Sequence, residues 1–191
     1  MDHFVDIQLL PDPELPTHVL RDALYAKLHL ALVMRRVGAG EIAVSFPRYS
    51  GRSGATGLGD SVRLLGSRPG LQELAPQAWL GSLRDLARVT EPADVPGSAM
   101  HRSLRRVQAK SNVDRLRRRQ MKRHGIDEDE ARRRIPEDVA ERLNLPFLHL
   151  RSTSTGQGFK LFLRLGPAQG TAVSGAFNTY GLSATATIPW F

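Results

Sequence analysis

The chain has 191 residues, a net charge of +8 and 41% hydrophobic residues, so it can bury a core and is not expected to be disordered. It lacks cysteine, which excludes disulfides and thiolate metal sites. No apolar run approaches the roughly 20 residues of a membrane span, and the acidic start of the chain is unlike a secretory signal, so we expect a cytoplasmic protein.

The first half of the chain predicts a mixed order of strands and helices. Residues 3–9 alternate between apolar and polar, which indicates a strand, whereas apolar residues recur at helical spacing within 17–36. The remaining expected elements are strands at 41–46, 61–65 and 86–90 and weak helix at 70–85. The order β-α-β-β-α-β is that of the ferredoxin-like (RRM-like) fold, which many RNA-binding modules share, although the fold itself implies no function.

A linker is predicted at 91–98, because Pro, Gly and Ser are concentrated there. A helix follows, capped by Ser111 or Asn112 and ended at Gly125, and Asp127 begins another helix that Pro136 interrupts before it resumes to about 143. Strands are expected at 147–151, at 159–165 and just before Pro189. We therefore expect an α+β protein with two domains, 1–93 and 99–191.

The positive charge is concentrated in one segment. Residues 101–134 contain 13 Lys and Arg against 5 Asp and Glu, and the rest of the chain contains 14 of each. Within that segment the signs separate into a basic block at 115–123 and an acidic block at 127–130. This separation favours a polyanion-binding surface, because phosphate neutralisation supplies much of the affinity of proteins for nucleic acids.

The basic block forms a cationic stripe on the predicted helix. Arg115, Arg119 and Arg123 recur every four residues, and Arg118 and Lys122 lie beside them, so all five share one face. Such a helix suits a groove of a duplex, where arginine binds phosphates or guanine edges. A surface helix neutralised by acidic neighbours is the alternative, and the stripe does not distinguish DNA from RNA.

A few residues could carry chemistry. His29 lies beside the apolar face of the first predicted helix, where histidine is often structural, but an imidazole can transfer protons near neutral pH, as RNA cleavage by transesterification requires. Ser152 and Ser154 lie in a polar loop, whose hydroxyls can equally stabilise a turn. Tyr180 is interpreted most simply as a packed aromatic.

Several catalytic classes lack their motifs. The six histidines are scattered without HxH or HExxH spacing, carboxylates cluster only at 127–130, and no GxxxxGK[ST] loop is present. A two-metal nuclease and an NTPase are therefore disfavoured, and we expect no metal and no cofactor. A metal-free ribonuclease needs none of these motifs, because the RNA supplies its own 2′-hydroxyl nucleophile.

Motifs spread over nearly the whole chain resemble those of the type I-F CRISPR repeat endoribonucleases. In the second half they are VQAKSN at 107–112, RLRRR at 115–119, RH at 123–124, EAR at 130–132, RIP at 134–136, LPF at 145–147, LRS at 150–152, STGQ at 154–157, KLF at 160–162, YGLS at 180–183 and PWF at 189–191. In the first half they are MDH at 1–3, PDP at 11–13, KLH at 27–29, VSFP at 44–47 and WL at 79–80.

The resemblance implies a ferredoxin-like domain that carries a catalytic histidine, joined to an RNA-binding domain. The substrate would be the CRISPR repeat hairpin, cut at the 3′ base of its stem. The helix with Arg115, Arg118, Arg119, Lys122 and Arg123 would enter the RNA major groove, which is normally too deep and narrow for protein readout but opens near the end of a short stem. The other implied RNA-binding residues are Arg106 and Gln108 for base edges, Phe159 for stacking on the terminal base pair, and Ser154 and Thr155 for phosphate and sugar.

The resemblance also implies that His29, Ser152 and Tyr180 are catalytic. Ser152 would position or activate the 2′-hydroxyl, Tyr180 would orient the site, and His29 would act as base or acid, with base the preferred assignment. Cleavage without metal would leave a 2′,3′-cyclic phosphate and a 5′-hydroxyl. The product would stay bound within a multisubunit type I-F surveillance complex.

Two alternatives share the arginine helix. The chain could be a non-cleaving hairpin-binding subunit of such a complex, in which case His29 and Ser152 would be structural. It could also be a general double-stranded nucleic-acid binder, which would be indifferent to loop sequence and sugar type.

Overall fold

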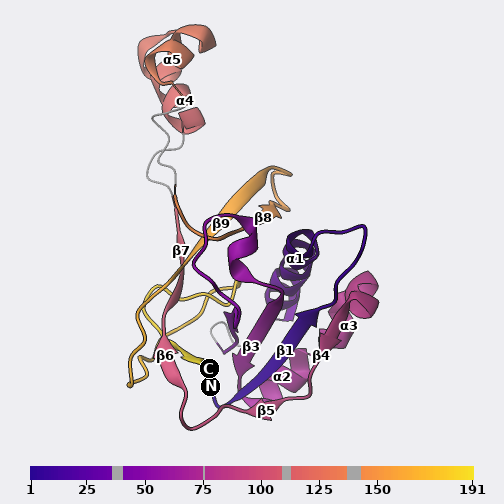
Figure 1. Ribbon diagram of the computed structural model, residues 1–191. Helices are drawn as coiled ribbons and strands as arrows, with labels where there is room; N and C mark the ends of the chain where they lie inside the picture. Colours follow the sequence, from indigo (N-terminus) through magenta and orange to yellow (C-terminus); the bar gives the residue numbers. More distant parts are fainter. Residues whose placement is uncertain (36–40, 75, 109–112, 137–142) are drawn as a thin grey trace. The chain divides into compact units, whose positions relative to one another are not determined.

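The computed structural model describes residues 1–35, 41–74, 76–108, 113–136 and 143–191 (Figure 1). The described residues form two compact units. One consists of Met1–Arg106 with Leu145–Phe191, and the other of Val107–Asn144. The predicted α+β class is confirmed. These units are defined by packing, whereas the predicted domains 1–93 and 99–191 are defined by function. The predicted domain division therefore stays a prediction.

The first sheet of the larger unit has the strand order β2-β3-β1-β4, with antiparallel neighbours. Its strands are β1 (His3–Leu9), β2 (Ala43–Ser45), β3 (Ser61–Gly66) and β4 (Ala87–Val89). The connecting helices are α1 (Thr17–Arg35), α2 (Arg68–Leu74), α3 (Pro76–Leu80), and the 3-10 turns η1 (Ala55–Leu58) and η2 (Gly81–Leu86). The element order β-α-β-β-α-β was predicted from the sequence, and the broad helical prediction at 70–85 corresponds to α2, α3 and η2.

Helix α1 lies on the core because its apolar residues recur every three or four positions. Leu20, Leu24, Leu28 and Ala31 are all buried on this face. Arg21 is also buried, and its two terminal guanidinium nitrogens donate to the carbonyls of Gly59, at 2.7 Å, and Ala55.

The C-terminal part of the larger unit adds two small sheets. In one, β9 (Gly158–Leu165) lies between β7 (Leu104–Val107) and β8 (Phe147–Arg151), and in the other β6 (Met100–Arg102) pairs with β10 (Ile188–Trp190). The free edge of β8 is held against α1, where the His149 amide donates to Asp22 Oδ2 at 3.1 Å. Buried leucines of β8 and β9 join the same core cluster as α1 and the first sheet. The N- and C-termini meet beside this unit's sheets (Figure 1), with the Phe4 and Phe191 rings 5.0 Å apart.

The sequence analysis missed some of these strands. β6 and β7 are short and rich in Arg and His, so they lack the alternation of apolar residues that indicates a strand. β5 (Ala93–Asp94) falls within the predicted linker and pairs with β1 at His3 and Phe4. The last strand, β10, includes Pro189, which is tolerated because β10 is an edge strand.

The described residues of the smaller unit form helices α4 (Val113–His124) and α5 (Glu128–Arg134), which pack together. Gly125 ends α4 in the left-handed region, at φ 62°, as predicted. Asp127 caps α5 by accepting the Glu130 amide at 2.8 Å, also as predicted. The predicted cap at Ser111 or Asn112 and the predicted resumption of helix after Pro136 lie outside the described residues.

Among the helices that the structure describes, none is both long and apolar enough to cross a membrane.

Candidate functional site

The His29 ring is held in one orientation by the loop that precedes Tyr180. Its Nδ1 lies 2.8 Å from the carbonyl oxygen of Thr179, and its ring stacks on that of Tyr180 at 3.9 Å between centroids and 4° between planes. A carbonyl oxygen only accepts, so Nδ1 carries the proton. In the neutral imidazole this leaves the lone pair on Nε2, which makes no hydrogen bond to any described residue.

The loop is a tight turn closed by Asn178. The Asn178 side chain accepts the amides of Tyr180, at 2.9 Å, and Leu182, at 3.2 Å, and its carbonyl accepts the Gly181 amide at 2.8 Å. Gly181 adopts φ 68°, and its carbonyl accepts the amide of buried Val44 from β2. The turn is thereby fixed to the first sheet, although the sequence around it shows no helix or strand period.

Tyr25 lies one helical turn before His29 and contacts the same loop. Its buried hydroxyl donates to the Tyr180 carbonyl at 2.7 Å, and its ring lies near-parallel to that of Tyr180 with centroids 6.4 Å apart. Burial raises the pKa of the Tyr25 hydroxyl well above its usual value. Sequence reasoning did not select Tyr25, but its i, i+4 spacing to His29 is a signal that places both side chains on one face of α1.

Ser152 directly follows β8 and opens a compact turn. Its hydroxyl lies 3.1 Å from that of Ser154 and accepts the Thr155 amide at 3.3 Å. Its amide donates to the Gln157 carbonyl, and its carbonyl accepts the Gly156 amide. Ser152 is half-buried, while Ser154 and Thr155 are exposed.

His29, Ser152 and Tyr180 all belong to the larger unit, although about 120 residues separate the first from the second in the chain. Helix α1 carries His29 and packs along β8, which ends at Arg151, next to Ser152. The structure therefore brings α1 and the strand leading to Ser152 together. It pairs His29 with Tyr180 directly, whereas His29 and Ser152 form no hydrogen bond with each other.

Two of the predicted RNA-binding residues meet on neighbouring strands of the second sheet. The Arg106 guanidinium on β7 lies 5.8 Å from the centroid of the half-buried Phe159 ring on β9. Arg106 is exposed, and so is Gln108, which follows β7 and is grouped with the smaller unit. An exposed arginine beside a half-buried ring can contact a base together with that ring.

Helix α4 carries the predicted cationic stripe. Arg118, Arg119, Lys122 and Arg123 are exposed, and nothing is described of the Arg115 side chain. Arg119, Lys122 and Arg123 make no ion pair with any residue that the structure describes.

The arginines of α5 differ from those of α4. Arg132 lies 2.7 Å from Glu128, and Arg134 lies 2.9 Å from Glu130, so these charges are neutralised along their own helix. Within the described part of the smaller unit, Arg119, Lys122 and Arg123 of α4 are therefore available to an anionic partner.

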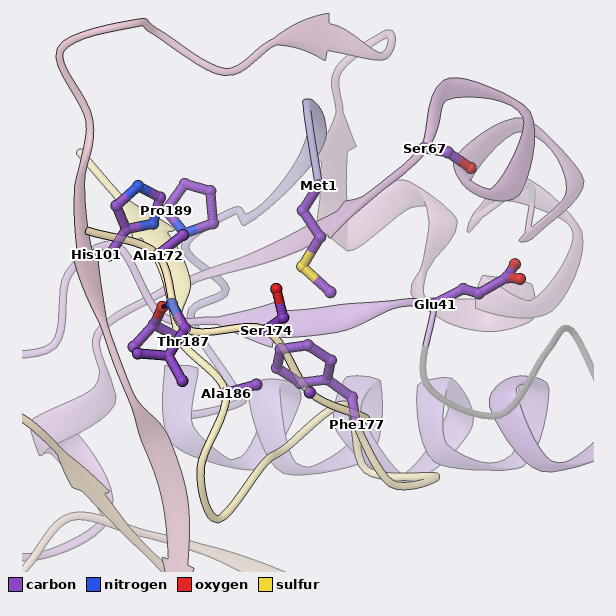
Figure 2. A pocket seen from close by; sticks show the side chains of 12 residues that line it. Met1, Glu41, Ser67, His101, Ala172, Ser174, Phe177, Ala186, Thr187 and Pro189 are labelled. Atoms are coloured by element: carbon purple, nitrogen blue, oxygen red, sulfur yellow. Dashed lines mark hydrogen bonds between the residues drawn. The ribbon is translucent and has the colours of Figure 1, made fainter. Parts of the chain in front are cut away.

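A pocket of about 510 Å³ lies elsewhere in the larger unit (Figure 2). Met1 points into it, Phe177 and Ser174 form part of its wall, and His101 and Glu41 line it from two sides. None of His29, Ser152 and Tyr180 lines this pocket, so the pocket is not part of the candidate site. Within the described part of the chain, no three His, Asp or Glu side chains gather in a way that could hold a metal ion.

Together these features describe an α+β protein with an oriented histidine beside a tyrosine, a hydroxyl-rich turn and a separate cationic helix, a set that suits a nucleic-acid-processing protein. Comparison with known proteins defines the family. The family model described as CRISPR-associated protein (Cas_Csy4) matches residues 4–191, and the chain belongs to this family. The predicted type I-F relationship is thereby confirmed.

Two relatives match over the full length of both chains. A CRISPR-associated endonuclease Cas6/Csy4 of Pseudomonas aeruginosa (strain UCBPP-PA14) is 50% identical. One of the same name from Escherichia coli (strain UTI89 / UPEC) is 44% identical.

Proposed function

We propose that this protein is a metal-independent endoribonuclease that cuts CRISPR repeat hairpins at the 3′ base of the stem to mature CRISPR RNA. Family membership and the endonuclease names of its full-length relatives support nuclease activity. The observation that carries the chemistry is the state of His29, whose Nδ1 proton is engaged by Thr179 and whose Nε2 is left as a proton acceptor.

In this proposal His29 is the general base. Its Nε2 takes the proton of the 2′-hydroxyl next to the cut, and the 2′-oxygen then forms a bond to phosphorus while the bond to the 5′-oxygen breaks. The leaving 5′-oxygen takes a proton from solvent. The products are a 2′,3′-cyclic phosphate and a 5′-hydroxyl, and every atom of the nucleophile comes from the RNA.

Ser152 and Tyr180 hold the reacting groups in place. The Ser152 hydroxyl, at the start of the turn, can donate to the 2′-oxygen or to the phosphate, while Ser154 and Thr155 offer exposed hydroxyls to the neighbouring phosphate and sugar. The Tyr180 ring fixes the plane of the His29 imidazole by stacking on it. Orientation of this kind can account for a large part of a catalytic rate, since a misplacement of about 1 Å can cost about 100-fold.

Binding of the hairpin is assigned to two groups of residues. The cations of α4, at Arg115, Arg118, Arg119, Lys122 and Arg123, neutralise stem phosphates. Arg106 and Gln108 contact base edges low in the stem, and Phe159 stacks on the terminal base pair. Extensive stem contacts of this kind explain why the product would stay bound, as a cytoplasmic subunit of a type I-F surveillance complex.

The test is incubation of the purified protein with its genome's CRISPR repeat RNA in EDTA, followed by analysis of the product ends. A single cut at the 3′ base of the stem, blocked by a 2′-deoxy nucleotide upstream of the cut, is expected. His29→Ala should abolish cutting and leave hairpin affinity nearly unchanged.

Tight binding without cutting by the unmodified protein would favour the alternative of a non-cleaving hairpin-binding subunit. Equal loss of binding and cutting in His29→Ala would make His29 a packing residue.

A further inference from the structure

Tyr25 is a buried tyrosine whose hydroxyl the proposed reaction does not use. It lies on α1 one helical turn before His29, so the two side chains lie on the same face of the helix. Tyr25 is only 1% exposed, and a hydroxyl buried to this extent needs a partner, because an unsatisfied polar group is costly to bury. The partner is a backbone carbonyl of the turn that orients His29, which gives the hydroxyl a route to the proposed base.

Tyr25 and His29 bind consecutive carbonyls of this turn. The Tyr25 hydroxyl donates to the Tyr180 carbonyl at 2.7 Å, and His29 Nδ1 donates to the Thr179 carbonyl at 2.8 Å. The turn is therefore attached to α1 at two adjacent points, and only one of them belongs to the proposed base. Because the Tyr25 hydroxyl is buried, water does not readily replace it as the donor to the Tyr180 carbonyl.

Asn178 fixes the amide side of the same two peptide groups. The Tyr180 amide, which shares a peptide group with the Thr179 carbonyl, donates to Asn178 Oδ1 at 2.9 Å. The Gly181 amide, which shares a peptide group with the Tyr180 carbonyl, donates to the Asn178 carbonyl at 2.8 Å. Each peptide group is thus held by Asn178 at its amide and by α1 at its carbonyl. Because the two groups share the Tyr180 Cα, a rotation of one peptide plane displaces the other.

The Tyr25 ring supports the ring that stacks on His29. It is near-parallel to the Tyr180 ring, at 13° with centroids 6.4 Å apart, and to the buried Phe46 ring, at 25° and 6.0 Å. Tyr180 in turn stacks on His29, so near-parallel rings link the core residue Phe46 to the proposed base. Tyr25→Phe keeps these ring contacts and removes only the hydroxyl, so the substitution isolates the hydrogen bond.

The turn has to stay in place most firmly when His29 takes a proton. In the proposed reaction Nε2 accepts the proton of the 2′-hydroxyl, and the imidazole becomes positively charged. The Thr179 carbonyl then accepts from a charged donor, and a hydrogen bond of this kind is roughly twice as strong as a neutral one. This stabilisation helps the reaction most when the carbonyl is already in position, because no energy is then spent on moving it. The bond from Tyr25 supplies that fixed position.

We propose that Tyr25 is a positioning residue for RNA cleavage, an inference that rests on the proposed function. Its hydroxyl holds the Tyr180 carbonyl, so that the neighbouring Thr179 carbonyl keeps the proton of His29 on Nδ1 and leaves Nε2 free to accept another. Tyr25 is buried and contacts neither the RNA nor the reacting atoms, so it acts only through the turn. It therefore affects the rate of cutting and not the affinity for the hairpin.

The test compares full-length Tyr25→Phe with the unmodified protein in a cleavage assay and by NMR. Single-turnover cutting of the CRISPR repeat hairpin at saturating protein should slow by about tenfold, because a misplacement of about 1 Å can cost about 100-fold, and Kd should change less than about twofold. Long-range 1H–15N spectra at about pH 8.5, where an ordinary histidine is neutral, report which ring nitrogen carries the proton. The His29 signals are assigned by their absence from His29→Ala. The unmodified protein should show the proton on Nδ1, and Tyr25→Phe should show a mixture of both tautomers.

Tyr49→Phe is the matched control. The Tyr49 hydroxyl also donates to a backbone carbonyl of the same unit, that of Leu163, at 3.3 Å. Its loss removes a comparable hydrogen bond without touching the turn that orients His29. Tyr49→Phe should therefore leave the cleavage rate, the hairpin affinity and the His29 tautomer unchanged.

Three results would overturn the inference. An unchanged tautomer in Tyr25→Phe would mean that the hydroxyl does not orient His29. A mixture of tautomers with an unchanged cleavage rate would mean that this orientation does not limit cutting. An equal loss of rate in Tyr49→Phe would assign the effect to general stability. Failure of the proposed function is distinguishable, since the unmodified protein would then not cut the hairpin, while the spectra would still report whether Tyr25 orients His29.

Discussion

Replacing Gly181 with alanine tests how the active-site turn is held. Gly181 has φ 68°, where a side chain costs about 1–2 kcal/mol. A Cβ at this position would lie 2.4 Å from Val44 Cγ2 and 2.9 Å from the Val44 amide nitrogen. Val44 is fully buried in β2 and cannot move away, so overpacking adds about 1–3 kcal/mol. We expect Gly181→Ala to lower the free energy of unfolding by about 2–5 kcal/mol.

The same substitution should impair cutting more than binding. The turn that Gly181 closes supplies both the Thr179 carbonyl to His29 and the Tyr180 ring that stacks on it. Relief of the clash shifts that turn, and a shift of about 1 Å at a reacting group can cost about 100-fold in rate. Single-turnover cleavage, hairpin affinity and urea unfolding measure the three effects separately.

Gly51→Ala is the matched control for this experiment. Gly51 has nearly the same φ, at 71°, but a Cβ there would meet only Tyr49 Cε1 at an ordinary 3.7 Å. It should cost about 1–2 kcal/mol and leave the cleavage rate unchanged. If both variants lose the same stability, or if Gly181→Ala cuts at the normal rate, the turn does not orient His29 as described.

Three further outcomes are expected. Arg119→Ala or Arg123→Ala should weaken hairpin binding and, in salt titrations, reduce the slope of log affinity against log salt by about 0.9 each. Arg133 is the control, because its guanidinium lies 3.5 Å from a Glu130 oxygen, and Arg133→Ala should leave that slope unchanged. Tyr25→Phe should lower stability by about 1 kcal/mol at neutral pH. Burial raises the Tyr25 pKa, so above about pH 10 the wild type loses stability, by up to about 1.4 kcal/mol per pH unit, and the variant does not. The variant's deficit in unfolding measurements should therefore disappear and reverse within about one pH unit above that point. A constant deficit would contradict the burial argument. Asp127→Ala should destabilise α5 by about 1 kcal/mol, seen as faster amide exchange in that helix, and unchanged exchange would mean that the cap contributes nothing.

Several helices, strands and helix ends were predictable because they depend on residues that are close in the sequence. The spacing of Leu20, Leu24 and Leu28 predicts α1, the alternation of 3–9 predicts β1, and Asp127 and Gly125 mark helix ends through their own side-chain and backbone chemistry. The cationic stripe is equally local, since charges four residues apart on a helix share a face. The residues that carry it could therefore be selected without knowledge of the tertiary structure.

The arrangement around His29 could not be predicted in this way. Its partner, the Thr179 carbonyl, is 150 residues away, and a backbone carbonyl has no signature in the sequence. Tyr25 acquires its role only because the turn at Tyr180 folds over α1, and β6 and β7 form only because partner strands complete them. The sequence by itself determined the helices, their ends and the distribution of charge, because these depend on neighbours in the chain. Only the tertiary structure decided which histidine nitrogen is free to accept a proton, because that depends on a contact between distant segments.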